Sequence, residues 1–340
     1  MKVAVAGATG AVGQRFIQLL QNHPWFELHE VLASERSRGR TLYEACKFRL
    51  FEMPGQIGNM KLKGLDEKIE SRLVFSALPS DVAKGIETKL TREGKVVASN
   101  AGAHRMDENV PLVIPEVNHE HLALVKGKKG FIITNANCTT TQLVMALKPL
   151  HDNFGLKKVS VVSMQALSGA GYPGVSGIEI NNNVLPHIAG EEEKVETEPL
   201  KILGRLKEGK IQYAELAVSA SCNRVNVTDG HLESVAVKLN KKASLHEVKK
   251  SMENFKSLPQ KLNLPSAPQA PIVYVNDDNR PQPRLDKETN KGMSVVVGRL
   301  KEDKILDFRF HCLGHNTIRG AAGGSILNAE ILHKLNLMEE

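Results

Sequence analysis

The start of the chain combines three features in an order that few folds accommodate. A short apolar run, Val3–Ala6, leads directly into Gly7, Gly10 and Gly13, and apolar residues then recur at helical spacing over Val12–Leu20. Apolar runs of this length favour a buried strand, whereas recurrence every three to four residues favours a helix. We therefore predict a strand, a glycine-rich turn and a helix, the opening unit of a parallel α/β sheet.

This turn has the chemistry of a dinucleotide site. Glycine lets the backbone turn tightly and approach a pyrophosphate closely, while N–H groups at the start of the following helix face the negative charge. The spacing is G-x-x-G-x-x-G instead of the more common G-x-G-x-x-G, and a glycine turn without a ligand is the alternative. Its position between strand and helix favours the cofactor. The predicted contacts are Gly7, Thr9, Gly10, Ala11, Val12 and Gly13.

The segment after the next apolar run indicates which cofactor binds. Leu28–Ala33 reads as the second strand, after which an acidic residue would read the ribose 2′-hydroxyl of NAD. The chain instead offers two hydroxyls and two guanidiniums, which suit a 2′-phosphate and favour NADP. Glu35 keeps NAD open, and a plain loop is the alternative. The predicted contacts are Ser34, Arg36, Ser37 and Arg38.

Strands and helices continue to alternate through the first part of the chain. Leu73–Leu78 and Lys95–Ser99 are further apolar strand candidates, and alternation of this kind implies a parallel sheet with helices on both faces. We predict a Rossmann-type dinucleotide-binding domain over residues 1–136. Doubly wound sheets bind ligands where strands end. The predicted contacts there are Ser76, Ala77, Leu78 and Pro79.

The rest of the chain has a different pattern, with longer β-rich alternation in Lys158–Met164, Glu233–Lys238 and Met293–Gly298. An antiparallel sheet with flanking helices explains it most simply. We predict an α+β domain over residues 137–315. Residues 316–340 then form a helix that returns to the first domain.

Composition and length exclude several classes of protein. The chain has 340 residues, 41% of them hydrophobic and 24% charged, which suits two globular domains. It has no apolar run long enough to span a membrane and no signal-like start, so we expect a cytoplasmic protein without membrane association. The four cysteines have no paired spacing, so we expect neither disulfides nor a metal site.

The net charge of +7 raises the question of nucleic acid. Basic and acidic residues are interspersed, however, and only four Tyr and one Trp are present for base stacking. We expect no nucleic-acid partner. Basic runs such as Lys126–Lys129 read as solvated faces, and the excess charge suits an anionic small molecule.

Cys138 is the candidate nucleophile. It stands between the apolar run Phe131–Ile133 and a helix-like segment, Gln142–Leu150. At a helix N-terminus the partial positive charge would lower the pKa of the thiol and help to hold an oxyanion. The alternative is a buried structural cysteine, because free cysteines are commonly buried.

Arg224 and His231 accompany this cysteine from a distant part of the chain. They are seven positions apart, which in a regular strand would place them on opposite faces. The turn signal Asp229–Gly230 interrupts the strand, so His231 can return beside Arg224. A structural histidine is the alternative; with a nucleophile nearby, His231 becomes a candidate acid/base.

In this order, the motifs resemble those of aspartate-β-semialdehyde dehydrogenases of the branch typical of archaea, fungi and some bacteria. The resemblance covers nearly the whole chain. Its segments are Gly7–Gly13, Ser76–Pro79, Ser99–Asn100 with Arg105, Asn135–Thr139, Gln165 with Ser168–Gly171, Glu191–Lys194, Arg224–His231 and Asn316–Ala322.

The resemblance implies a catalytic and dimerisation domain like that of glyceraldehyde-3-phosphate dehydrogenase, in a homodimer or homotetramer. It implies that Cys138 attacks β-aspartyl phosphate and that NADPH reduces the thioacyl enzyme to the semialdehyde, a precursor of lysine, threonine and methionine. His231 is then the acid/base. Gln165 orients the acyl group, and Asn137 with the Cys138 N–H holds the oxyanion.

The same resemblance distributes the charges of the substrate. Arg224 takes the α-carboxylate and Glu191 the ammonium, although Glu192 stays open for that role, and a Glu191–Lys194 pair is also an ordinary surface pair. Phosphate falls to Asn100, Arg105 and Lys194. The remaining cofactor contacts are Ser168, Gly169, Asn316 and Gly320.

Three alternatives stay open. A malonyl- or succinyl-CoA reductase of the same superfamily would share the fold, NADP, Cys138 and His231. A dehydrogenase for an N-acetylated semialdehyde would give Glu191 no ammonium to bind. A non-catalytic NADP-binding sensor would need neither Cys138 nor His231.

Overall fold

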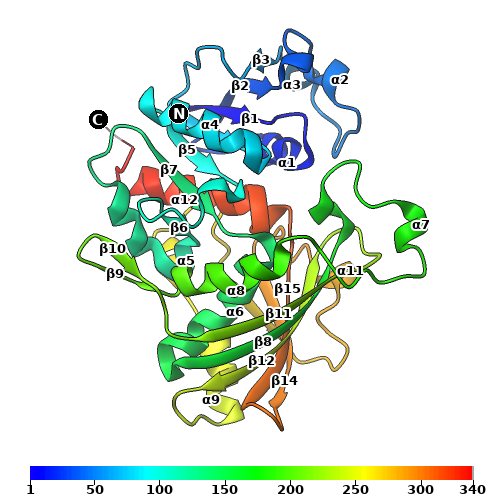
Figure 1. The fold of residues 1–340 in the computed structure, drawn as a ribbon, viewed down its shortest axis with the longest axis vertical. Coiled ribbons are helices and arrows are strands. Elements are labelled where there is room, and N and C mark those ends of the chain that lie inside the picture. Colours follow the sequence, from blue (N-terminus) through cyan, green and yellow to red (C-terminus); the bar gives the residue numbers. More distant parts are fainter. Residues whose placement is uncertain (339–340) are drawn as a thin grey trace.

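The computed structural model describes residues 1–338, and two sheets lie one above the other along its long axis (Figure 1). The N-terminal sheet has seven strands in the order β3-β2-β1-β4-β5-β7-β6, all parallel. Crossover connections of this kind agree with the expected α/β class. The strands are β1 (Lys2–Ala6), β2 (Glu27–Ala33), β3 (Lys63–Gly64), β4 (Leu73–Ser76), β5 (Val96–Ser99), β6 (Leu112–Val113) and β7 (Phe131–Asn135).

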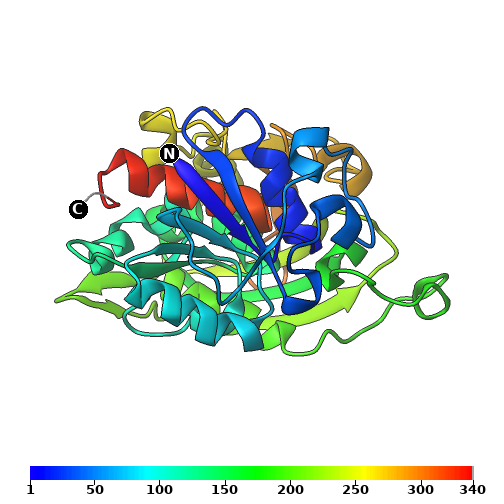
Figure 2. The ribbon, with the colours of Figure 1, turned by 90° about the horizontal axis from the view of Figure 1, so that it is seen from above.

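Helices cover both faces of this sheet, as alternation along β1 requires. Val3 and Val5 share an apolar core with α1 (Ala11–Leu20) and α12 (Gly323–Lys334), whereas Ala4 and Ala6 face α4 (Ser80–Arg92). Seen from above, α1 and α12 lie on one side of the sheet and α4 on the other (Figure 2). The helix at the C-terminal end of the chain therefore completes the core of the N-terminal sheet.

The second sheet has six strands in the order β11-β8-β12-β15-β14-β13. The central pairs are antiparallel, but β11 runs parallel to β8 and β13 parallel to β14. The prediction of an antiparallel sheet is therefore wrong at both edges, because alternation reports which face is buried and not the direction of a strand. The strands are β8 (Leu156–Gln165), β11 (Ala217–Arg224), β12 (His231–Leu239), β13 (Ile272–Val275), β14 (Val295–Glu302) and β15 (Phe308–Gly314).

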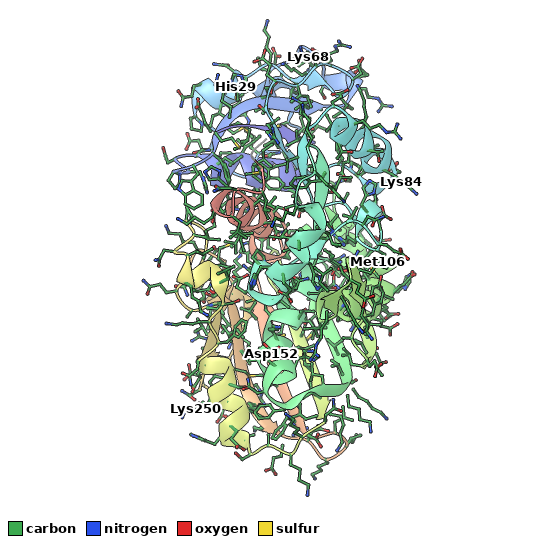
Figure 3. All side chains as sticks on the ribbon, turned by 90° about the vertical axis from the view of Figure 1, so that its left-hand side faces the viewer. His29, Lys68, Lys84, Met106, Asp152 and Lys250 are labelled. Carbon is green, nitrogen blue, oxygen red and sulfur yellow. The ribbon has the colours of Figure 1, made fainter. Side chains whose placement is uncertain are left out.

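Helices pack on one face of this second sheet. They are α6 (Cys138–Phe154), α8 (Glu191–Ile202) and α9 (Leu245–Glu253), and Val159 and Val161 point into the core beneath them. Lys158, Ser160 and Val162 alternate with these residues and are exposed on the other face. Charged side chains such as Lys84 and Lys250 lie on the outside of the molecule (Figure 3).

Short elements lie in the connections within and between the two sheets, and two of them, β9 and β10, pair as a separate two-stranded antiparallel sheet. The segment that carries α7 extends away from the rest of the molecule in both ribbon views (Figures 1 and 2). The short elements are η1 (Glu35–Ser37), α2 (Leu42–Ala45), α3 (Gly55–Gly58), η2 (Gly102–His104), α5 (Pro115–Asn118), η3 (His119–Val125), η4 (Leu167–Ala170), α7 (Gly177–Ile180), β9 (Arg205–Lys207), β10 (Lys210–Gln212), α10 (Leu258–Lys261), α11 (Pro283–Asp286) and η5 (Ile318–Ala322).

Candidate active site

Cys138 is the first residue of α6, directly after β7 and its connection. Asn137 caps this helix: its side-chain Oδ1 accepts the backbone N–H groups of Thr139 at 2.8 Å and Thr140 at 3.1 Å. Within residues 1–338, the backbone N–H of Cys138 has no hydrogen-bond acceptor. This leaves one donor beside the thiol that is free to hold an oxyanion.

Three adjacent strands of the second sheet contribute the side chains opposite Cys138. Arg224, at the end of β11, pairs in register with Gln165 at the end of β8. The chain then turns back, and β12 begins at His231 on the other side of β8. The Asp229–Gly230 turn thus brings His231 to the same end of the sheet as Arg224, as its turn signal suggested. Gln165, Arg224 and His231 are all buried.

The Sγ atom of Cys138 lies 3.3 Å from Nε2 of His231. Burial lowers the pKa of His231 to about 3, and the charges of Arg224 and His315 act in the same direction. Burial, with a contribution from Glu191, raises the pKa of the Cys138 thiol to about 12, although Arg105 and Arg224 oppose this shift. The expectation that the helix terminus would lower the thiol pKa is wrong, because burial outweighs the charge at the helix end.

Within the acidic run Glu191–Glu193 of α8, Glu191 is the residue whose carboxylate contacts both neighbours of Cys138, Asn137 and Thr139. Its carboxylate accepts the Asn137 side-chain amide at 2.9 Å and the Lys194 ammonium at 3.4 Å. Glu192 accepts instead the backbone N–H of Cys222 at 3.0 Å, and Glu193 is exposed. The geometry thus favours Glu191 over its neighbours as the carboxylate of the site.

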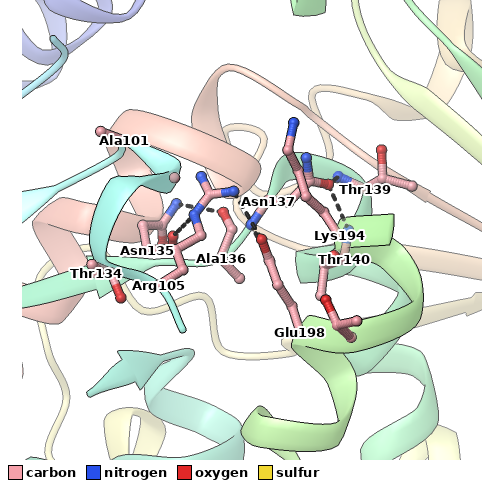
Figure 4. A network of polar contacts seen from close by, with 12 residues as sticks. Ala101, Arg105, Thr134, Asn135, Ala136, Asn137, Thr139, Thr140, Lys194 and Glu198 are labelled. Carbon is pink, nitrogen blue, oxygen red and sulfur yellow. Dashed lines mark hydrogen bonds and ion pairs between the residues drawn. The ribbon is translucent and has the colours of Figure 1, made fainter. Parts of the chain in front are cut away.

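Arg105 belongs to a buried network on the other side of Asn137 (Figure 4). Its guanidinium donates to the Glu198 carboxylate at 2.9 Å and to the backbone carbonyls of Asn135 at 2.9 Å and Asn100 at 2.8 Å. Three of the five N–H groups of a guanidinium are thereby occupied, and two are left for a ligand. The Asn100 side-chain amide nitrogen is buried and lacks a partner within residues 1–338, which also suits an anion beside Arg105.

Sequence reasoning missed two residues that position this network. The Glu198 carboxylate bridges Arg105 and the backbone N–H of Asn137, the latter at 2.7 Å. The Lys201 ammonium donates to the carbonyls of Arg105, Asp107 and Val110 at 2.7 to 2.9 Å, and burial lowers its pKa to about 8. Glu198 stands two helical turns after Glu191, so its place on the same face of a helix was a usable signal.

The glycine turn fits a pyrophosphate. Gly7 has a φ of +78°, and a Cβ atom there would lie 2.6 Å from the Ala77 carbonyl oxygen. The helix α1 has no side-chain cap, and the backbone N–H groups of its first three residues, Ala11–Gly13, have no acceptor within residues 1–338. The Ala77 N–H bonds to the Ala6 carbonyl, so the segment Ser76–Pro79 lies directly beside this turn. Free donors at a helix N-terminus beside crowded glycines are what an anionic dinucleotide requires.

The segment expected to read the ribose is less clearly built. Ser34 and Arg36 are exposed, and Ser37 is half-buried. Arg38 is already committed to acidic neighbours, with Glu67 at 2.9 Å and Glu35 at 3.3 Å. The structure therefore leaves Arg36, rather than Arg38, as the guanidinium available to a 2′-phosphate.

The remaining predicted cofactor contacts lie against the thiol site. The Asn316 side chain donates to the Ser168 hydroxyl at 2.8 Å and accepts the Gly230 N–H at 2.9 Å. A Cβ atom at Gly169 would lie 2.8 Å from the Arg224 guanidinium, and one at Gly320 would lie 2.8 Å from the Cα of Cys138. Gly169 and Gly320 thus pack against Arg224 and Cys138, and Asn316 links Ser168 to Gly230.

Residues 1–338 contain neither a membrane-spanning helix nor a cluster of metal-ligating side chains. No helix there is long and apolar enough to cross a membrane, and no three His, Cys, Asp or Glu side chains come together as metal ligands would. All four cysteines are free thiols.

Comparison with protein families gives two matches. Residues 2–125 match the semialdehyde dehydrogenase NAD binding domain, and residues 147–319 match the semialdehyde dehydrogenase dimerisation domain. The second match indicates a homo-oligomer.

Individual proteins are similar over almost the whole length. An aspartate-semialdehyde dehydrogenase of Archaeoglobus fulgidus is 51% identical, covering 98% of both chains, and one of Schizosaccharomyces pombe is 46% identical, covering 99% of both. The crystal structure of the Candida albicans aspartate semialdehyde dehydrogenase with NADP superposes with a TM-score of 0.92, at 41% identity and 99% coverage of both chains. Family, fold and length agree, and the chain belongs to the aspartate-semialdehyde dehydrogenases of the semialdehyde dehydrogenase family.

Proposed function

We propose that the chain catalyses the NADPH-dependent reductive dephosphorylation of L-4-aspartyl phosphate to L-aspartate 4-semialdehyde. The observation that carries this proposal is the thiol–imidazole contact of 3.3 Å, with two guanidiniums and one carboxylate among the charges that act on the thiol. This charge pattern complements a substrate that carries a carboxylate, an acyl phosphate and an ammonium group.

Arg224 and Glu191 are the proposed recognition groups for the amino-acid end of the substrate. The Arg224 guanidinium donates to the Ala166 carbonyl at 2.7 Å, which orients it and leaves further donors for an α-carboxylate. The Glu191 carboxylate is 6% exposed and is oriented by Asn137, and it suits the substrate ammonium. A site with buried charges discriminates strongly, because a substrate lacking the matching group leaves them unpaired.

The phosphate falls to Asn100, Arg105 and Lys194. Arg105 and Asn100 keep unoccupied N–H donors, as described above, and the Lys194 side chain is 42% exposed and can move toward an incoming anion. Sγ of Cys138 then attacks the acyl carbon and phosphate leaves, giving a thioacyl enzyme. The Cys138 N–H and the remaining Asn137 amide proton hold the oxyanion, Gln165 orients the acyl group and His231 is the proton-transfer partner.

NADP is the proposed cofactor, held by the turn Gly7–Gly13, by Ser76–Pro79 and by Ser34, Arg36 and Ser37. When bound as NADPH it supplies the hydride that reduces the thioacyl group. The chain's own contribution is the row of free N–H donors at α1 and the packing of Gly169 and Gly320 against the thiol site. At Gly320 an added Cβ atom would lie 2.8 Å from the Cα of Cys138, so glycine suits this position.

For the assembly, the finer proposal is a homodimer or a homotetramer. The face of the second sheet with Lys158, Ser160 and Val162 has no helix over it within residues 1–338, and Val162 is 42% exposed there. A sheet face that exposes an apolar and a small polar side chain beside a lysine suits a second copy of the sheet. Four free thiols fit the reducing cytoplasm, where this step would supply lysine, threonine and methionine synthesis.

The test is the reverse reaction, phosphate-dependent reduction of NADP⁺ by aspartate semialdehyde, with malonate semialdehyde plus coenzyme A run in parallel. We expect turnover with aspartate semialdehyde and phosphate, and none with malonate semialdehyde and coenzyme A. Turnover only with coenzyme A would keep the fold and Cys138 but replace the substrate, and no turnover with either pair would leave a binding protein. The Arg224→Lys variant sharpens the result, since a loss confined to the KM for aspartate semialdehyde supports its carboxylate role.

A further inference from the structure

Gln142 is a polar residue of α6 that the proposed chemistry does not use. It stands four positions after Cys138, so the two side chains lie on the same face of the helix. Its side-chain Nε2 donates to the backbone carbonyl of His231 and to the Glu233 carboxyl group, both at 2.8 Å. All three residues are buried. The two N–H groups of one amide therefore join the helix that carries the thiol to the strand that begins with the imidazole.

The surroundings fix the orientation of this amide. A backbone carbonyl can only accept, so the nitrogen of the Gln142 amide, and not its oxygen, must face His231. Gly314 of β15 pairs in register with His231, and a Cβ atom there would overlap the Gln142 side chain. The amide is thus enclosed between α6, β12 and β15. Both of its N–H groups are occupied, which leaves it no donor for a ligand.

Gln142 is also a singular connection. Apart from Cys138 itself, it is the residue of α6 that hydrogen-bonds β12 within residues 1–338. The ring of His231 has a different anchor, because its Nδ1 lies 3.0 Å from the backbone nitrogen of Ala166, directly after β8. Ala166 therefore holds the ring to the sheet, whereas Gln142 holds the backbone of His231 to the helix.

We propose that Gln142 is a positioning residue, which sets the separation of the Cys138 thiol and the His231 imidazole by holding the start of β12 against α6. The separation at stake is the 3.3 Å between Sγ and Nε2. Loss of Gln142 should lower the reactivity of the thiol and kcat, with the KM for aspartate semialdehyde and the affinity for NADP unchanged. The statement about kcat rests on the proposed function, whereas thiol reactivity is measured without substrate.

Gln142→Leu removes both hydrogen bonds and leaves an apolar side chain in the same space. Alkylation by iodoacetamide at neutral pH is followed on the Cys138 peptide, because three other thiols are present. We expect alkylation to slow roughly tenfold and kcat to fall by about 10-fold to 10²-fold, since a displacement of about 1 Å at reacting atoms costs about 10²-fold.

Leu150→Ala is the control for a loosened helix. Leu150 is a buried residue about three turns after Cys138 on α6, so its truncation weakens the packing of the same helix away from the site. Leu150→Ala should keep the wild-type alkylation rate and kcat. Slowing in Leu150→Ala as large as that in Gln142→Leu would overturn the proposal.

A double-mutant cycle with His231→Asn separates positioning of the imidazole from any other effect on the thiol. If Gln142 acts through His231, Gln142→Leu slows alkylation in the wild-type background and has no further effect in the His231→Asn background. Equal slowing in both backgrounds would contradict the proposal, and so would wild-type alkylation in Gln142→Leu.

Gly314→Ala keeps the proposal testable where Gln142→Leu does not fold. The added Cβ displaces the flexible end of the Gln142 side chain without deleting it. We expect slower alkylation of Cys138 that again depends on His231, and unchanged alkylation in this variant would count against the proposal. Failure of the proposed function would appear separately, as a wild-type chain without phosphate-dependent turnover whose alkylation still couples Gln142 to His231.

Discussion

The site around Cys138 and the loop Ser34–Arg38 were both expected from the sequence to bind charged groups, but they are built differently. Glu191 and Arg224 are at most 6% exposed, and each is held by hydrogen bonds from other parts of the chain. In the loop, the Arg38 side chain is 46% exposed, and its carboxylate partners Glu35 and Glu67 are 64% and 32% exposed. The first site has its charges fixed in place, whereas the second offers them to solvent.

This difference decides how much each region can contribute. Charges in a buried, water-poor site interact strongly and lose little freedom when a ligand arrives. Exposed ion pairs are screened by water and salt and contribute up to about 1 kcal/mol each. We therefore expect changes near Cys138 to remove activity, and changes in the loop to adjust the choice of cofactor.

The largest effect is expected for Cys138→Ala. Without the nucleophile the thioacyl step is lost, and turnover should fall at least about 10⁴-fold. NADP binding, measured by fluorescence titration, should be retained because the glycine turn is untouched. Cys46→Ala is the control, since Cys46 is a free thiol outside the site and should keep wild-type turnover. Full turnover in Cys138→Ala would remove the thioacyl mechanism.

A smaller but still large effect is expected for Gly320→Ala. The added Cβ would lie 2.8 Å from both Cα and Cβ of Cys138, so the thiol must shift. A displacement of about 1 Å at a reacting atom costs on the order of 10²-fold in kcat. Gly85→Ala, in α4, is the matched control, because an added Cβ there meets nothing within 4 Å. Equal kcat in the two variants would show that Gly320 does not constrain Cys138.

Features formed by one segment of the chain could be predicted from the sequence, whereas contacts between distant segments could not. The glycine turn and the first strand are local patterns, and the Asp229–Gly230 signal correctly indicated that the chain turns back before His231. Glu198 lies 93 positions from its partner Arg105, so no local pattern pairs them. Arg38 illustrates the same limit, because its carboxylate partners Asp66 and Glu67 come from another connection.

The prediction of a lowered pKa for the Cys138 thiol was wrong for a related reason. A helix N-terminus can be predicted from the segment around Cys138, but the burial that raises the thiol pKa to about 12 comes from distant segments packed around it. Strand direction in the second sheet is likewise a property of the connections. Properties that depend on one segment could therefore be predicted from the sequence. Properties that depend on burial by distant segments could not.

The burial of Glu233, two residues after His231, also predicts that the stability of the protein depends on pH. Burial raises the pKa of Glu233 to about 8, and its carboxyl group contacts the Gln142 amide at 2.8 Å. The folded state therefore binds this proton more tightly than the unfolded state, whose pKa is about 4.3. The stabilising contribution is complete below about pH 4.3 and is lost as the pH rises to about 8.

Glu233→Gln keeps the shape of the side chain but removes this titration. Its free energy of unfolding in urea should match or fall below that of the wild type at pH 5 and should gain on it at pH 8.5. Glu302→Gln, at an exposed position, serves as the control and should follow the wild type at both values. A constant difference between Glu233→Gln and the wild type at both pH values would contradict the raised pKa.

The smallest effects are expected in the loop Ser34–Arg38. Arg36→Ala should raise the KM for NADPH by up to about fivefold, the equivalent of one exposed charge pair, with the KM for NADH unchanged. Arg38→Ala should change it less, because the Arg38 guanidinium already contacts Glu67 at 2.9 Å. Both effects should shrink as salt is added. If Arg38→Ala proved the more damaging variant, its carboxylate partners would have to release it when the cofactor binds, and the loop would be as organised as the thiol site.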